Sequence, residues 1–291
     1  MRCVSHSDRT PSLHLSDGPD GRLLVRCFAG CEQAAVLKAL RTYQAGDVET
    51  QTSNNSTLPP SRKDIDRERA AAAVAIWQVS RPATGTLVAA YLGSRCITIN
   101  PPSAIRFHSG LRHAPSGQTL PAMVAGIQSP SGDLAGIHRT FLALDGFGKA
   151  HVEPQRMMLG TGHGGAVRIT PAAETLALVE GVEDALALVQ LTRTPCWAVV
   201  GVAGFRNVVL PPTVRTVILG PDNDEAGQAV IQPAGQRFIA QGLAVQVARP
   251  PWGAKDWNAA LELYEERAAI AEHEGKVAPD SVDLVARKGW C

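Results

Sequence analysis

Apolar runs of strand length alternate with segments of helical period over the second half of this 291-residue chain. The predicted elements are strand 175–180, helix 182–191, strand 196–200, strand 214–219, helix 225–241, strand 243–248 and helix 257–268. Alternation of this kind favours an α/β unit with a mainly parallel sheet and right-handed crossovers.

The earlier part of the chain has a different pattern. An alanine-rich helix is predicted over 64–79 and a second helix over 86–95, and short apolar runs then alternate with Gly, Pro and Ser clusters up to 168. These features indicate a mixed α+β middle region dominated by strands. Residues 42–62 are polar, contain Pro59-Pro60 and have no hydrophobic period, which is typical of a linker.

Acidic residues stand where two of the predicted strands end. Glu180 closes the strand 175–180 and Asp184 follows one helical turn later, while Asp222 and Asp224 follow the strand 214–219. Carboxylates gathered at one sheet edge repel one another unless a cation neutralises them, and an all-oxygen set suits Mg²⁺. The competing interpretation of Asp222-x-Asp224 is a turn with a helix N-cap.

At this point the residues resemble a known family. Glu180-Gly-x-x-Asp184 followed by Asp222-x-Asp224 resembles the Toprim signature shared by bacterial-type primases, topoisomerases and some nucleases. The segment 251–258, Pro-Trp-Gly-Ala-Lys-Asp256-Trp-Asn, is similar to the third acidic motif of phage and plasmid Toprim primases. The resemblance implies that Glu180, Asp222 and Asp224 are catalytic. It implies a Mg²⁺ or Mn²⁺ site formed by Glu180, Asp184, Asp222, Asp224 and Asp256.

Two close pairs of metal ligands lie near the N-terminus. Cys3-x-x-His6 and Cys27-x-x-x-Cys31 are separated by a segment of hairpin length, which suits a tetrahedral zinc site. A reduced, metal-free cysteine-rich turn is the alternative. Residues 3–31 resemble the zinc-binding ribbon that precedes Toprim in bacterial and phage primases, except that Val4 replaces the usual proline. Because family members carry a preceding helix, we expect the start to be trimmed or misassigned. A short helix is predicted over 32–41.

Charge is unevenly distributed, although the chain has 28 Lys and Arg against 27 Asp and Glu. Residues 62–170 contain 12 basic and 6 acidic residues, whereas residues 171–291 contain 10 and 15. A basic half suits nucleic-acid phosphates, although such an excess also occurs on ordinary surfaces. Segments 120–125 and 136–146 resemble the domain before Toprim in phage and integrative-element primases. The phosphate contacts expected from this resemblance are Arg139, Lys149, Arg156 and Arg168. Lys255, next to Asp256, is a further candidate for offsetting phosphate charge, and for each of these residues a solvated surface cation is the alternative.

The predicted organisation is α+β overall. It comprises a zinc ribbon over 1–41, a linker over 42–62, a basic middle region over 63–170, an α/β Toprim domain over 171–261 and a helical tail over 262–291. Without an apolar run of eighteen residues or a basic-then-apolar leader, neither a membrane span nor a signal peptide is indicated, and a cytoplasmic location is expected.

The resemblance implies a DNA primase of mobile-element type, which makes short RNA primers on single-stranded DNA from ribonucleoside triphosphates by nucleotidyl transfer. It implies structural Zn²⁺ and catalytic Mg²⁺ or Mn²⁺. Because no Gly-x-x-x-x-Gly-Lys-Ser/Thr motif occurs, a replicative helicase is expected as a separate partner. The alternatives are a Toprim nuclease that cuts DNA and a non-catalytic DNA-binding accessory protein of replication.

Overall fold

The computed structural model describes residues 2–7, 11–17, 23–43 and 62–274. The chain divides into two compact units, Met1–Pro59 and Pro60–Cys291. The division falls within the predicted linker, of which residues 44–61 lie outside the described part. Residues 275–291 of the predicted tail also lie outside it.

The first unit is a hairpin with one helix. Strands β1 (Leu13–Asp17) and β2 (Leu23–Cys27) pair antiparallel, and helix α1 (Gln33–Tyr43) follows. Side chains alternate across the hairpin, so Leu13 and Val25 face a small core with Val36 of α1. The predicted ribbon and its following helix are both confirmed.

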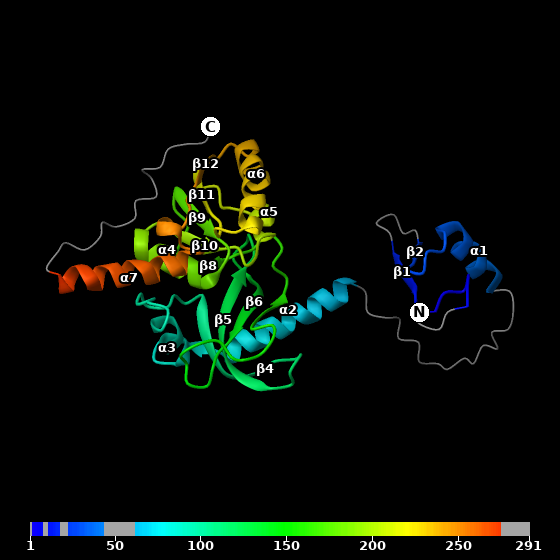
Figure 1. Ribbon diagram of the computed structural model, residues 1–291, viewed down its shortest axis with the longest axis horizontal. Helices are drawn as coiled ribbons and strands as arrows, with labels where there is room; N and C mark the ends of the chain where they lie inside the picture. The colour runs from blue at the N-terminus through cyan, green and yellow to red at the C-terminus, as the bar shows by residue number, and fades with distance from the viewer. Residues whose placement is uncertain (1, 8–10, 18–22, 44–61, 275–291) are drawn as a thin grey trace. The chain divides into compact units, whose positions relative to one another are not determined.

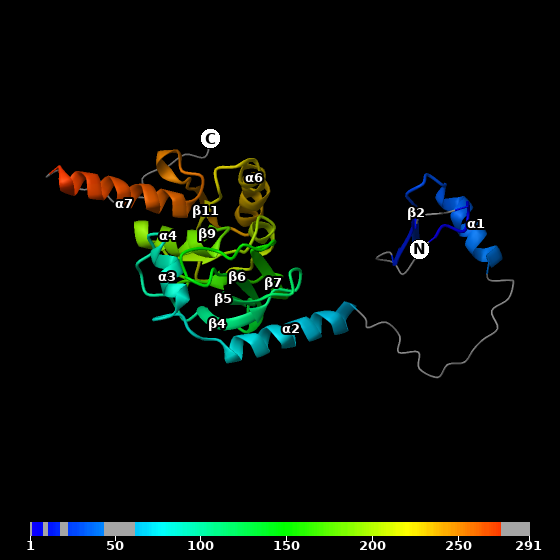
Figure 2. The same ribbon diagram turned by 60° about the horizontal axis from the view of Figure 1, so that its bottom comes forward.

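The second unit begins with an antiparallel sheet of five strands in the order β3-β4-β5-β6-β7. Its elements are α2 (Arg62–Val79), β3 (Arg81–Pro82), α3 (Leu87–Gly93), β4 (Ile105–Arg112), β5 (Thr119–Gln128), β6 (Leu134–Phe141) and β7 (Arg156–Gly160). Helix α2 covers one face of this sheet, as Figure 2 shows, and contributes Ala73, Ile76 and Trp77 to the core on that face. The two helices predicted from the sequence are therefore confirmed.

The rest of the second unit is built on another five-stranded sheet, ordered β12-β11-β9-β10-β8. Its elements are β8 (Val167–Arg168), β9 (Thr175–Val179), α4 (Val182–Thr192), β10 (Cys196–Ala198), α5 (Gly204–Asn207), β11 (Thr216–Gly220), α6 (Glu225–Ala240), β12 (Ala244–Val247), a 3₁₀ turn (Pro251–Gly253) and α7 (Trp257–His273). Strands β9 to β12 pair in parallel, and β8 is antiparallel to β10. The predicted mainly parallel sheet is confirmed.

Two hydrophobic clusters sandwich this second sheet. Helices α5 and α6 pack on one face through Phe205, Val230 and Phe238. On the other face, α4 and α7 share a single cluster with α3 and with β4 and β5 of the first sheet, including Phe107 and Met123. Figure 1 shows the second sheet above the first, with α4 at the left of the second sheet and α3 at the lower left beside the first. The predicted boundary at residue 170 therefore does not separate two hydrophobic cores.

Two details differ from the sequence prediction. Strand β8, within the predicted middle region, hydrogen-bonds to β10 and so belongs to the second sheet. Helix α7 continues to His273, beyond its predicted end at 268, because no glycine or proline interrupts residues 258–274. None of the helices in the described part of the chain has the length and hydropathy required to cross a lipid bilayer.

Candidate metal centre and its basic neighbours

The predicted carboxylates gather at the carboxyl edge of the parallel sheet. Glu180 follows β9, and Asp222 and Asp224 follow β11, which is the direct neighbour of β9. Asp224 is the N-cap of α6, where its Oδ1 accepts a hydrogen bond of 2.7 Å from the Gly227 N–H. Asp256 caps α7 in the same way, accepting from the Ala259 N–H at 2.7 Å. The N-cap interpretation is therefore correct for Asp224, but it does not account for Asp222.

Asn223 braces the loop that carries Asp222 against the loop that carries Asp256. Its backbone N–H donates to the Lys255 carbonyl at 2.7 Å, and its side-chain Nδ2 donates to the Ala254 carbonyl at 2.7 Å. Asp184 makes a second link, because its Oδ1 accepts a hydrogen bond of 3.0 Å from the Asn258 N–H. Hydrogen bonds between backbone and side-chain groups thus hold three acidic segments, far apart in the sequence, at one edge.

Glycines of the acidic motifs leave room for these carboxylates. A Cβ atom at Gly181 would collide with the carboxylate of Asp184, and one at Gly227 would collide with the backbone carbonyl of Asp222. The residue following Glu180 and the residue at the start of α6 must therefore be small. This crowding is a physical reason for the Glu-Gly and Asp-x-Asp-x-x-Gly spacings.

Burial and mutual repulsion raise the pKa values of these acids. The pKa of Asp184, which is only 8% exposed, rises to about 7 because of burial and the nearby Asp256 and Asp222. Burial, Glu180 and Asp256 raise the pKa of Asp222 to about 6. The pKa of Glu180 is also raised, by burial and by Asp224. Negative charge is therefore concentrated here without full compensation.

These properties fit a divalent cation. The Oδ1 atom of Asp222 is buried and has no hydrogen-bond partner, so it retains a lone pair for a ligand bond. Mg²⁺ is commonly held by one or two carboxylates and keeps several of its waters, so it does not require a closed cage of protein ligands.

A buried acid that the sequence analysis missed lies beside this edge. Glu183 is 1% exposed, and its Oε1 accepts a hydrogen bond of 2.7 Å from the Tyr91 hydroxyl and lies 3.6 Å from Arg156 Nη2. Although burial opposes ionisation, the cations Arg156 and Lys149 lower the pKa of Glu183 to about 2. The available signal was a second acid within Glu-Gly-Val-Glu-Asp, but its partners lie on distant segments.

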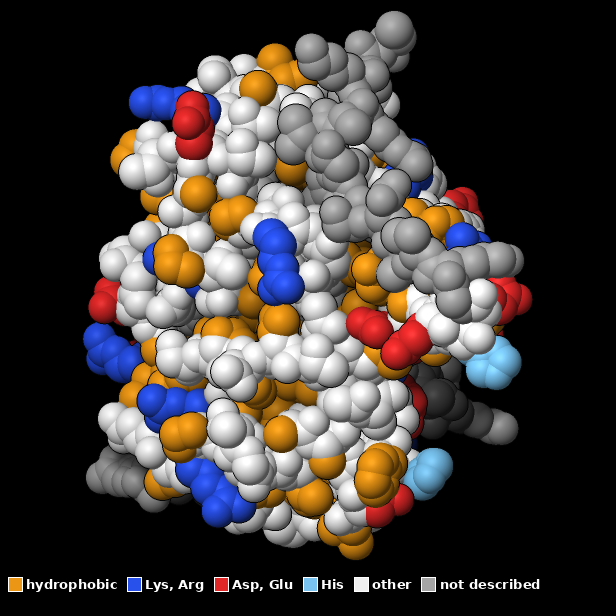
Figure 3. Space-filling view, turned by 90° about the vertical axis from the view of Figure 1, so that its left-hand side faces the viewer, with side chains coloured by type: hydrophobic (Ala, Val, Ile, Leu, Met, Phe, Trp, Pro, Cys, Tyr) orange, Lys and Arg blue, Asp and Glu red, His pale blue; other side chains and the backbone are white. Residues whose placement is uncertain are grey.

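The predicted phosphate contacts separate into two groups. Lys149 and Arg156 lie close enough to Glu183 and Asp184 for those carboxylates to affect their pKa values, so the fold brings them to the acidic edge. Lys255 is exposed, and its positive charge partly offsets the rise in the pKa of Asp222. Over the face drawn in Figure 3, Lys and Arg side chains lie as separate groups among hydrophobic ones rather than as one patch.

Arg139 and Arg168 are not brought to this edge. Arg139 is 8% exposed and shares the face of β6 with Ile137 and Phe141, which pack toward α2. Arg168 lies on β8 directly opposite Trp197 of β10 and stacks on its ring. His138, which precedes Arg139 in β6, faces the acidic side, where it lines a cavity of about 280 Å³ with Arg156 and Glu180.

The four predicted zinc ligands converge in the first unit. One ligand atom from each of Cys3, His6, Cys27 and Cys31 lies within 4.8 Å of the other three, and His6 Nδ1 is 3.1 Å from Cys31 Sγ. The backbone at Cys31 lowers the pKa of Cys27 to about 6, which favours the thiolate form that zinc requires. No disulfide joins the five cysteines in the described part of the chain. The thiols of the three cysteines and the imidazole of His6 form a Cys₃His set that fits Zn²⁺.

Sequence comparison identifies the unit that carries the carboxylates. Residues 175–264 match the family described as a Toprim domain. This chain contains a Toprim domain. The match extends from β9 into α7 and includes all five predicted acidic ligands. Residues 67–169, before the Toprim domain, match a domain of unknown function (DUF7146). No curated protein matches the chain.

Several solved primase structures share weak similarity with the chain. The primase fragment of the bacteriophage T7 primase-helicase protein is 18% identical, with a TM-score of 0.40, over 58% of this chain and 65% of its own length. The zinc-binding and RNA polymerase domains of the Aquifex aeolicus primase are 15% identical, with a TM-score of 0.43, over 94% and 81%. The RNA polymerase domain of Mycobacterium tuberculosis primase DnaG is 21% identical, with a TM-score of 0.40, over 73% and 89%. The chain spans less than two thirds of the T7 fragment, and the assignment of the Toprim domain rests on the sequence match.

Zinc content tests the Cys and His cluster. We expect the purified protein to carry about one zinc ion per chain and Cys27→Ser to carry almost none, because a structural site needs all four ligands. Atomic emission spectroscopy after gel filtration measures this. The matched control is Cys96→Ser, which alters a half-buried cysteine of the second unit. Equal zinc in Cys27→Ser and the unmodified protein would contradict the assignment.

Glu183→Gln tests the buried charge cluster. The amide keeps an acceptor for Tyr91 but leaves Arg156 and Lys149 without their countercharge, so we expect a loss of about 1–3 kcal/mol in the free energy of unfolding. Because the pKa of Glu183 is lowered to about 2, this stabilisation is present above its ordinary pKa and is lost as the pH falls toward 2. Urea unfolding at pH 7 and pH 3 measures both effects.

The control for this variant is Glu262→Gln, which removes an ion pair of 4.0 Å between exposed Glu262 and Arg95. We expect it to cost less than about 0.5 kcal/mol. Equal effects of the two substitutions would show that Glu183 has no special electrostatic role.

The raised pKa values of Asp184 and Asp222 predict a pH-dependent stability. The folded protein holds these protons more tightly than the unfolded chain, so this stabilisation is full below the ordinary carboxyl pKa and is lost as the pH rises through about 6 and 7. Without added divalent metal, we expect the free energy of unfolding of Asp184→Asn to rise by about 1–3 kcal/mol relative to that of the unmodified protein as the pH increases from 4 to 8.

Added Mg²⁺ should raise the melting temperature of the unmodified protein at pH 8 more than at pH 5, and should raise that of Asp184→Asn less. Differential scanning calorimetry measures these shifts. Asp145→Asn, at an exposed loop position, serves as the control and should respond like the unmodified protein. A pH-independent difference between Asp184→Asn and the unmodified protein would refute the electrostatic account.

Proposed function

We propose that the chain is a DNA primase that synthesises short RNA primers on single-stranded DNA for replication of a phage, plasmid or other mobile element. The observation that carries this proposal is that carboxylates with raised pKa values lie beside two cations, Lys149 and Arg156. Glu180 and Asp222 end adjacent parallel strands with raised pKa values, and Arg156 stands beside the same edge. Such a site suits a reaction between polyanionic substrates.

The proposed reaction is nucleotidyl transfer. The oxygen of a primer 3′-hydroxyl bonds to the α-phosphorus of a ribonucleoside triphosphate, the bond to the leaving pyrophosphate breaks, and the hydroxyl proton goes to a base. Glu180 suits this base because burial and Asp224 raise its pKa, which makes its carboxylate a better proton acceptor. Lys149 and Arg156 offset negative charge on the triphosphate.

Divalent metal is part of the proposal. Glu180, Asp184, Asp222, Asp224 and Asp256 are the residues that would hold Mg²⁺ or Mn²⁺. When bound, the metal supplies positive charge that lowers the pKa of the attacking hydroxyl and neutralises the phosphates. Lys255 and Asn223 act on the same loops, the former through its charge on Asp222 and the latter through its brace to Ala254.

The zinc-binding unit is proposed to contact the template. Its exposed hairpin face carries Arg26 directly opposite His14, and Phe28 beyond β2 is 70% exposed. The Arg26 guanidinium lies 5.3 Å from the centre of the Phe28 ring. An exposed aromatic ring beside an arginine is a surface on which unpaired bases stack. A helicase carried by a separate chain is the proposed partner that supplies single-stranded DNA.

Incorporation of labelled ribonucleotides on single-stranded DNA tests the proposal. With Mg²⁺ or Mn²⁺, we expect short RNA products from the unmodified protein and a loss of about 100-fold or more in Glu180→Gln and Asp222→Ala. Glu225→Gln is the control, because Glu225 is an exposed carboxylate of the same motif segment. Glu180→Gln should fold at least as stably as the unmodified protein, since Glu180 is destabilised when charged.

The other outcomes identify the alternatives. Cleavage of single-stranded DNA in Mg²⁺ without nucleotides, lost in Asp222→Ala, would replace the primase with a Toprim nuclease. DNA binding without synthesis or cleavage, with Asp222→Ala fully functional in a replication assay, would favour the accessory protein.

A further inference from the structure

A cleft of about 840 Å³ lies between the two sheets of the second unit, away from the carboxylates. Its walls include residues 170–172, which precede β9, and Pro211 and Thr213, which precede β11. Glu180 and Asp222 follow those same strands. A five-residue strand is roughly 16 Å long, so the length of the sheet separates the cleft from the acidic edge. It is a distinct site.

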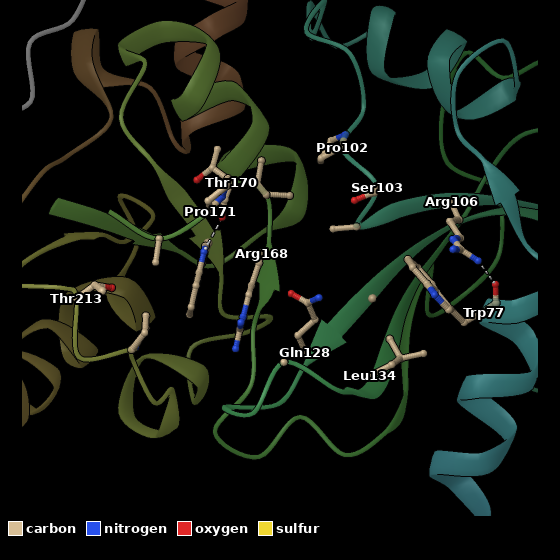
Figure 4. Close-up of a pocket in the computed structure, with 17 residues that line it drawn as sticks. Trp77, Pro102, Ser103, Arg106, Gln128, Leu134, Arg168, Thr170, Pro171 and Thr213 are labelled. Atoms are coloured by element: carbon tan, nitrogen blue, oxygen red, sulfur yellow. Dashed lines mark hydrogen bonds between the residues drawn. The ribbon is translucent and has the colours of Figure 1, made fainter. Parts of the chain in front are cut away.

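Two stacked pairs of arginine and tryptophan form facing walls of the cleft. Arg106 of β4 lies 4.3 Å from the ring centre of Trp77 on α2. Arg168 of β8 lies 4.6 Å from that of Trp197 on β10. Figure 4 shows Gln128 between the Arg168 side chain and the wall that carries Trp77 and Arg106. The cleft is therefore bounded by flat groups on two sides with an amide between them.

Hydrogen bonds hold the guanidinium groups in place. Arg106 Nη1 donates to the Trp77 carbonyl at 2.9 Å, and Arg168 Nη2 donates to the Ser129 carbonyl at 2.6 Å. These hydrogen bonds hold both guanidinium groups against their tryptophan rings, so the walls of the cleft are preorganised.

The charge of the cleft selects the kind of ligand. Arg106 and Arg168 are the only ionisable side chains among the described residues that line it, and neither is paired there with a carboxylate. Burial lowers the pKa of Arg168, so an anion would favour its charged form. Guanidinium planes and tryptophan rings stack on nucleobases, and arginine binds phosphate. The volume is within the range of small-molecule sites.

We propose that this cleft binds a nucleotide, with its base against the stacked arginine and tryptophan pairs and its phosphate near Arg168. Gln128 supplies an amide donor and acceptor for the edge of the base. The nucleotide is either free or part of a single strand, since both present the same base and phosphate. Binding here needs no divalent metal, which separates it from the carboxylate site and from primer synthesis.

Binding to the full-length protein without added divalent metal tests this proposal. The probes are 8-azidoadenosine monophosphate and an oligodeoxythymidylate that contains 5-iododeoxyuridine. After irradiation, peptide mapping should place cross-links from at least one probe at Trp77 or Trp197. Asp222→Ala should give the same cross-links, so a failed primase assay would not affect this result.

Affinity measurements assign the residues. We expect Arg168→Gln and Arg106→Gln to weaken binding of adenosine monophosphate or of the oligonucleotide by about 10-fold or more. The matched control is Arg237→Gln. Arg237 also stacks on an aromatic ring, 4.1 Å from the centre of Phe238, and donates to a carbonyl at 2.9 Å, but it lies outside the cleft. Gln128→Ala, which removes no charge, repeats the test if an arginine variant fails to fold.

The two probes distinguish the sources. Cross-linking and affinity loss with the monophosphate alone would assign the cleft to a free nucleotide, and the same results with the oligonucleotide alone would assign it to a strand. Cross-links confined to other segments, or cleft variants that bind both probes as well as Arg237→Gln, would overturn the proposal and leave the stacked pairs a purely structural role.

Discussion

Repulsion among carboxylates at one edge of the Toprim sheet is the constraint on which the rest of the site depends. Five acidic residues come from three segments of the chain, and burial and mutual proximity raise the pKa values of Glu180, Asp184 and Asp222. The fold tolerates this because rigid backbone contacts, such as those of Asn223 and Asn258, prevent the loops from separating. A bound cation, or a polyanionic substrate together with its metal, would therefore reduce the repulsion among these carboxylates.

The cluster around Glu183, beside these carboxylates, differs from them because its acid has a lowered pKa. Glu183 is more deeply buried than the other acids, yet it is held ionised by Arg156 and Lys149 and by the Tyr91 hydroxyl. Tyr91 belongs to α3, and Arg156 belongs to β7, so the cluster joins the first sheet and its helix to the Toprim helix α4. Glu183 thereby holds Arg156 and Lys149 beside the other carboxylates.

Much of this arrangement could be predicted from the sequence. Apolar runs that stop at Glu180 and Asp222 are local features, and the shared edge follows from parallel pairing. The ligands of the ribbon were equally accessible from their spacing. The role of Glu183 could not be predicted, because it depends on a hydrogen bond from Tyr91, 92 residues away, and on cations that the first sheet supplies. Arg139 was predicted as a phosphate contact from the family resemblance, although alternation with Ile137 and Phe141 along β6 was a sign that its side chain faces inward.

The edge strand β8 has a consequence for how such proteins evolve. It belongs to residues that precede the Toprim match, yet it covers the otherwise open side of β10. A gene fragment cut at the boundaries of the sequence signature would leave that strand edge exposed, and exposed edges recruit strands from other molecules. Recombination among genes that encode such chains should therefore keep β8 together with the Toprim sheet, so the heritable unit is larger than the motif by which it is recognised.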